Sequence, residues 1–99
     1  MEERSYRNLP ETAADATWND VGVGYSSVYR VYVRKTKIYV YYDITETDQR
    51  KTWNNRSLYI MDKVAEIREL DKILPDRFID VLNKRFPGLI PNDDPKTID

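Results

Sequence analysis

The stretch SVYRVYVRKTKIYVYYDIT, residues 27–45, decides the fold because apolar and polar side chains alternate along it. A period of two is typical of a β-strand with one buried face. We therefore predict one strand over residues 21–33 and a second strand over residues 37–48. Gly22 and Gly24 predict a bend or a break of the first strand near residue 24.

The length of the loop between these strands sets which residues pair. A two-residue loop, Lys35-Thr36, and a four-residue loop over residues 34–37 both place Val33 opposite Ile38. A three-residue loop would shift the register by one and mix valines with arginines on both faces. We favour the four-residue loop, because Lys35-Thr36 lacks the glycine or asparagine that two-residue turns prefer.

In this register the hairpin has one apolar face and one face of tyrosine and cationic side chains. The second face and its turn form the Arg/Tyr face, which consists of Arg30, Tyr32, Arg34, Lys35, Lys37, Tyr39 and Tyr41. Tyrosine and arginine dominate binding hot spots, because each combines a large contact area with a polar end. We predict that these residues bind the partner.

Two other interpretations of the Arg/Tyr face stay open. In the first it is an ordinary sheet face, solvated or partly covered by the N-terminal segment, on which tyrosines and arginines pair. In the second, bases of single-stranded nucleic acid stack on Tyr32, Tyr39 and Tyr41 while the cations bind phosphates. The formal net charge of −1 weighs against nucleic acid.

Apolar residues after the hairpin have helical spacing. A first helix is predicted to begin after a cap at Asn54, Asn55 or Ser57 and to end near residue 70. Its apolar stripe consists of Ile60, Met61, Val64 and Ile67. A second helix is predicted from Pro75 to the Pro87-Gly88 stop, with an apolar stripe of Phe78, Ile79, Leu82 and Phe86.

These elements predict an α+β fold. An antiparallel β-hairpin, with a third strand as an open alternative, is expected to pack against two C-terminal amphipathic helices. The 99 residues suffice for one core. We expect an N-terminal arm over residues 1–20, with a short helix as the alternative, a single domain over 21–91 and a flexible tail over 92–99. The open edges of a hairpin also allow a homodimer through strand pairing.

The chain contains neither histidine nor cysteine. This composition excludes Ser-His-Asp and Cys-His catalysis, a histidine general base, thiolate metal sites and disulfides. The densest carboxylate cluster outside the tail is Asp43, Glu46 and Asp48, but strand alternation points Asp43 away from the other two. We therefore predict no catalytic, cofactor-binding or metal-binding residues and no enzymatic activity.

The predicted function is a non-enzymatic protein-interaction module, such as a small stoichiometric inhibitor or adaptor. The alternative is a single-stranded nucleic-acid-binding protein that uses the same Arg/Tyr face. Accessory proteins of viruses and mobile elements often have this make-up, and such an origin is our hypothesis. The longest apolar run, residues 38–42, is far shorter than the ~20 residues of a membrane span, and residues 1–11 lack the apolar core of a signal peptide. We expect a cytoplasmic protein that does not bind membranes.

Overall fold

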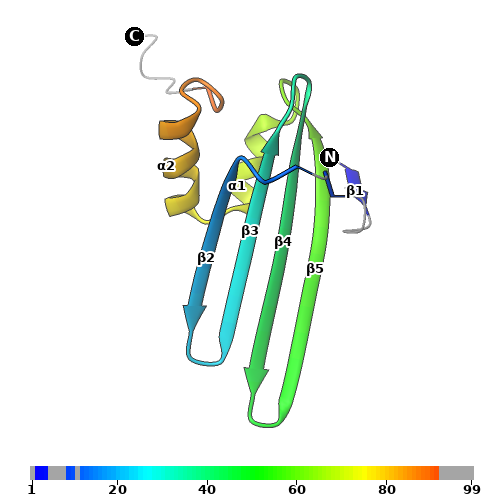
Figure 1. Cartoon of the computed structure of the whole chain (residues 1–99), viewed down its shortest axis with the longest axis vertical. Coiled ribbons are helices and arrows are strands. Elements are labelled where there is room, and N and C mark those ends of the chain that lie inside the picture. Colours follow the sequence, from blue (N-terminus) through cyan, green and yellow to red (C-terminus); the bar gives the residue numbers. More distant parts are fainter. Residues whose placement is uncertain (1, 5–8, 11, 92–99) are drawn as a thin grey trace. The chain divides into compact units, whose positions relative to one another are not determined.

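The computed structural model describes residues 2–4, 9–10 and 12–91 and divides the chain into two compact units, Met1–Glu66 and Ile67–Asp99 (Figure 1). The first unit is a five-stranded antiparallel sheet with the strand order β1-β5-β4-β3-β2. Its strands are β1 (Glu2–Arg4), β2 (Ala16–Gly22), β3 (Tyr25–Val33), β4 (Lys37–Asp48) and β5 (Lys51–Asp62). The α+β class is confirmed, with more strands than the sequence predicted. The expected tail over 92–99 lies outside the described residues.

The hairpin predicted from residues 27–45 is present as β3 and β4. Strand β4 has the predicted bounds, and Val33 lies opposite Ile38 as both even-numbered loops require. The Arg34 N–H donates a hydrogen bond to the Lys37 carbonyl at 2.9 Å, which closes the turn. The central apolar residues of this hairpin, Val31, Ile38 and Val40, are fully buried.

The chain reverses near Gly24 instead of bending within one strand. Residues 16–22 form β2, so residues 16–20, which we expected in an arm or a short helix, are paired with β3. Gly24 has φ +81°, and a Cβ at this position would lie 2.9 Å from the Thr47 carbonyl oxygen. The Thr47 N–H also donates a hydrogen bond to the Gly24 carbonyl at 2.7 Å. Glycine is therefore required where the β2–β3 turn meets β4.

The first predicted helix is wrong, because residues 51–62 form β5. This strand pairs with β4 along its whole length, from Asp48↔Lys51 to Lys37↔Asp62. Leu58 and Met61 are both fully buried although they lie on opposite faces of the sheet. A strand that is apolar on both faces loses its alternation and resembles a helical stripe. Val64, which the helical stripe included, is 86% exposed.

Strand β1 covers only part of the outer edge of β5. It pairs with Leu58, Tyr59 and Ile60, and in the described part of the chain no strand pairs with residues 51–57 on that side. The opposite edge of the sheet is β2. Both edges therefore offer backbone groups to a further strand, and the homodimer through strand pairing stays a prediction.

The second unit contains two short helices, α1 (Leu70–Ile73) and α2 (Asp76–Arg85), and a 3₁₀ turn (Ile67–Glu69) before them. Helix α2 confirms the second predicted helix, with Pro75 at its N-cap position. Phe78, Ile79 and Leu82 of its apolar stripe are buried. Packing of the helices against the sheet stays a prediction. None of the helices in the described ranges has the length and apolar character needed to cross a membrane.

Candidate functional site

The structure brings the central residues of the Arg/Tyr face together. Tyr32 lies opposite Tyr39, and Arg30 lies opposite Tyr41, as predicted. Strand β5 adds Leu58 to this face, where it lies opposite Tyr41. The sequence predicted Leu58 in a helix. The face is therefore built by three strands and not by two.

Much of this face is buried. Tyr32 is only 4% exposed and Tyr41 only 7%, and Leu58 beside them is fully buried. Arg30 and Tyr39 are half-buried, whereas Lys35 and Lys37 at the turn are exposed. Two of the three tyrosines that we expected to contact a partner therefore lie beneath other atoms of this chain.

The arginines of the Arg/Tyr face contact its own tyrosines. The guanidinium carbon of Arg30 lies 5.4 Å from the centroid of the Tyr41 ring, and that of Arg34 lies 5.7 Å from the Tyr32 ring. Cations at these distances are attracted to the electron-rich face of the ring. These are the internal pairs expected if the face is an ordinary sheet face.

The segment between β1 and β2 also meets this face. Because β1 and β2 lie at opposite edges of the sheet, this connection has to cross from one edge to the other, and Figure 1 shows its blue trace passing across β4 and β3. Arg34 donates hydrogen bonds to the Asp15 carboxylate at 3.2 Å and to the Thr12 hydroxyl at 2.7 Å. Since Arg34 also stacks on Tyr32, Thr12 and Asp15 of this segment lie beside the Arg/Tyr face.

The carboxylates of β4 are divided between the two faces, as strand alternation predicted. Asp43 lies on the Arg/Tyr face, where Arg56 Nε is 3.2 Å from its Oδ2 and Asn54 Nδ2 is 2.7 Å from its Oδ1. Glu46 and Asp48 lie on the opposite face. Within the described residues, no group of three or more carboxylates is arranged to hold a metal ion.

The opposite face of the sheet carries a second aromatic group that sequence analysis missed. We call it the distal aromatic face; its members are Trp18, Tyr25, Tyr29, Tyr42, Ile44 and Trp53. Trp18, Tyr29 and Tyr42 form one row across three strands, with ring centroids of Tyr29 and Tyr42 6.1 Å apart. Tyr25 and Trp53 belong to a second row, nearer the turns at residues 22–25 and 48–51, and Glu46 lies between them.

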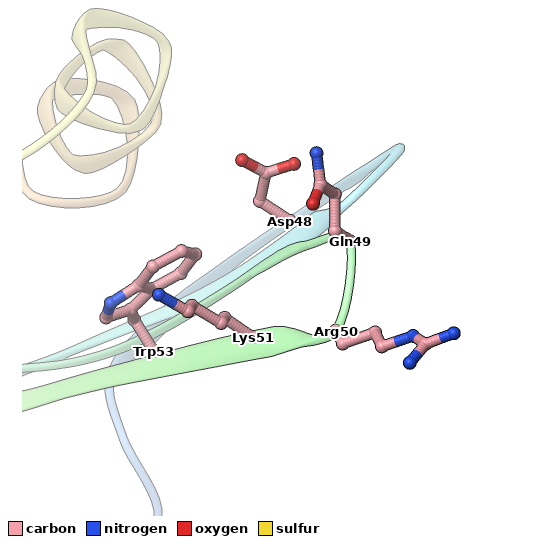
Figure 2. A pocket seen from close by; sticks show the side chains of 5 residues that line it. All are labelled: Asp48, Gln49, Arg50, Lys51 and Trp53. Atoms are coloured by element: carbon pink, nitrogen blue, oxygen red, sulfur yellow. The ribbon is translucent and has the colours of Figure 1, made fainter.

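The end of this face is open to solvent. Tyr25 is 41% exposed and Trp53 is 53% exposed. A hollow of ≈ 360 Å³ beside them is lined by Asp48, Gln49, Arg50, Lys51 and Trp53. Figure 2 shows the side chains of Asp48, Lys51 and Trp53 on the same side of the β4–β5 tip, with Arg50 pointing away.

The pKa values of Tyr25, Tyr29 and Tyr41 are raised above the ordinary value for tyrosine. A hydrogen bond from its hydroxyl to the Asp20 carboxylate at 3.1 Å, and the charge of that carboxylate, raise the pKa of Tyr25. Partial burial, followed by the charges of Tyr42 and Asp20, raises the pKa of Tyr29. On the other face, burial and then the charge of Asp43 raise the pKa of Tyr41.

One sequence signal marks the distal aromatic face. On the predicted apolar face, the side chains change along β3 and β4 from valine and isoleucine to Tyr29 and Tyr42. Trp53 completes the face only because β5 is a strand. No family model matches the chain, and neither curated proteins nor solved structures give a match.

Proposed function

We propose that this protein is a non-enzymatic protein-interaction module, acting as a small inhibitor or adaptor, and that it binds through the distal aromatic face. One observation carries the proposal. The described residues include five exposed large hydrophobic side chains, and four of them lie at one end of the sheet. Tyr25 and Trp53 lie on the distal aromatic face, Val23 lies in the β2–β3 turn, and Val21 lies on the opposite face. Grouped exposed apolar side chains mark interaction sites more often than scattered ones do.

The charges of this surface favour a protein over a nucleic acid. Asp20, Glu46 and Asp48 lie on the same face as the exposed rings, and carboxylates repel phosphates. On the Arg/Tyr face, two of the three tyrosines expected to stack with bases are buried. A single-stranded nucleic-acid-binding protein therefore remains the less favoured alternative.

In this proposal the buried residues of the Arg/Tyr face stabilise the sheet, and its exposed residues stay accessible at the edge of the face. Tyr32 and Tyr41 hold the sheet together, while Lys35, Lys37 and part of Tyr39 are open to a partner. Binding by these rim residues stays a prediction.

The test is affinity capture of partners from the native host, with nuclease treatment, by three versions of the protein. We expect the wild type and a Lys35→Ala/Tyr39→Ala variant to capture the same protein, and a Tyr25→Ala/Trp53→Ala variant to lose it, since truncated aromatic hot spots cost more than 1 kcal/mol each. Full capture by the Tyr25→Ala/Trp53→Ala variant would contradict the proposed surface. Capture that nuclease abolishes would favour the nucleic-acid alternative.

A further inference from the structure

We propose that the distal aromatic face binds a cationic segment of its partner, rich in arginine or lysine. This inference rests on the proposed function and names the chemistry of the partner. It is drawn from the carboxylates that surround the exposed rings, and from a comparison with the carboxylates of the other face.

Each exposed ring of the distal aromatic face has a carboxylate as a neighbour. Asp20 accepts a hydrogen bond from the Tyr25 hydroxyl at 3.1 Å. Glu46 is the cross-strand neighbour of both Tyr25 and Trp53. Such neighbours have Cβ atoms about 5 Å apart, close enough for their side chains to contact one guest group together.

These carboxylates have no cation of their own. In the part of the chain that the structure describes, Asp20, Glu46 and Asp48 form no ion pair. Lys51 lies opposite Asp48 without pairing to it. With Lys51 and with Arg50, which lines the same hollow, the three carboxylates leave a local charge of −1 at this end of the sheet.

The Arg/Tyr face also combines aromatic rings with carboxylates, and there the chain supplies the cation as well. There the guanidinium of Arg34 stacks on Tyr32 and forms an ion pair with Asp15 at 3.2 Å. Arg30 likewise stacks on Tyr41, whose hydroxyl lies 3.5 Å from an Asp43 oxygen. Each of these aromatic–carboxylate sets receives an arginine from the chain itself.

The distal aromatic face has the ring and the carboxylate, but none of the described arginines stacks on its exposed rings. A guanidinium placed there gains both a cation–π contact and a charge-assisted hydrogen bond, the two interactions for which arginine is suited. The guanidinium is placed beside Glu46, between Tyr25 and Trp53. The hollow near Asp48 and Trp53 is also lined by the cations Arg50 and Lys51 and is not part of this site (Figure 2). The missing cation is therefore assigned to the partner.

The test uses a labelled peptide of alternating arginine and serine, with a glutamate–serine peptide and oligo-dT of the same length as comparison probes. We expect saturable binding of the arginine peptide, a change in tryptophan fluorescence, and weaker binding as salt screens the charges. The Glu46→Gln/Asp48→Asn variant is expected to bind about fivefold more weakly, since each exposed charge pair contributes modestly.

The matched control is Asp71→Asn/Asp80→Asn, which removes two exposed carboxylates from the second unit and changes the net charge equally. This control is expected to bind the arginine peptide like the wild type. Equal weakening of both variants, absence of binding, or tighter binding of oligo-dT would each overturn the inference.

Failure of this inference is distinguishable from failure of the proposed function. If the natural partner is lost by Tyr25→Ala/Trp53→Ala but kept by Glu46→Gln/Asp48→Asn, the surface is correct and the cationic partner is wrong. If the Tyr25→Ala/Trp53→Ala variant also keeps the partner, the proposed surface itself is wrong.

Discussion

The two faces of the β3–β4 hairpin have similar side chains but differ in how those side chains are satisfied. On the Arg/Tyr face, arginines stack on buried tyrosines and pair with carboxylates of this chain. On the distal aromatic face, Tyr25 and Trp53 are exposed, and Asp20, Glu46 and Asp48 form no ion pair within the described residues. The difference teaches that residue types favoured in interfaces do not by themselves locate an exposed surface, because their contacts within the chain decide whether they are accessible.

The largest expected effect concerns the buried apolar residues on the same side of the sheet as the distal aromatic face. Val40 is fully buried, so Val40→Asp places an unpaired carboxylate in an apolar site at a cost of several kcal/mol, comparable to the whole stability of a small domain. We expect the variant to be unfolded by circular dichroism. Trp53→Asp, on the open face, is the control and is expected to fold. A cooperatively folded Val40→Asp protein would contradict the described core.

The second prediction has a smaller expected effect and compares the loss of stability when one tyrosine from each face is removed. Tyr41 is buried beneath Arg30, and we expect Tyr41→Ala to lower the free energy of unfolding by about 3 kcal/mol. Tyr25 is exposed, and Tyr25→Ala is expected to lower the free energy of unfolding by only about 0.5 kcal/mol. Urea denaturation of both variants measures the contrast. Equal losses would show that the two faces do not differ in structural role.

The smallest effect is a dependence of stability on alkaline pH. The pKa of Tyr41 is raised above its ordinary value of 10.0, mainly by burial, so the folded state favours the neutral phenol. The contribution of Tyr41 to the free energy of unfolding is therefore expected to be fully present below pH 10.0 and to be lost as pH rises through its folded-state pKa. Urea denaturation across this range should show a shallower fall for Tyr41→Phe than for wild type. An identical fall would mean that Tyr41 does not contribute.

Local sequence patterns predicted the elements whose environment is simple. The bounds of β4 and the pairing of Val33 with Ile38 follow from the alternation of apolar and polar side chains. This alternation is clear near the β3–β4 turn, where one face of the hairpin is apolar. Helix α2 follows from Pro75 and a stripe on one side. Neither case depends on distant parts of the chain.

The remaining features depend on contacts that are distant in sequence. Strand β5 was misread because Leu58 and Met61 are buried on opposite faces. On the Arg/Tyr face, Arg34 contacts Thr12 and Asp15, which lie 22 and 19 residues away in sequence. The seven predicted binding residues are thus brought together largely as expected, while their exposure is not what alternation suggested.

The contact between Gly24 and Thr47 has a consequence for the thermodynamics of binding. Their 2.7 Å backbone hydrogen bond joins the β2–β3 turn to the β4–β5 hairpin, and Tyr25 and Trp53 lie on the two sides of this link. Independent hairpin tips would have to be immobilised by the partner, at an entropic cost to affinity. Because folding has already fixed the two tips against each other, the exposed rings are pre-organised, and more of the interaction energy remains available as affinity.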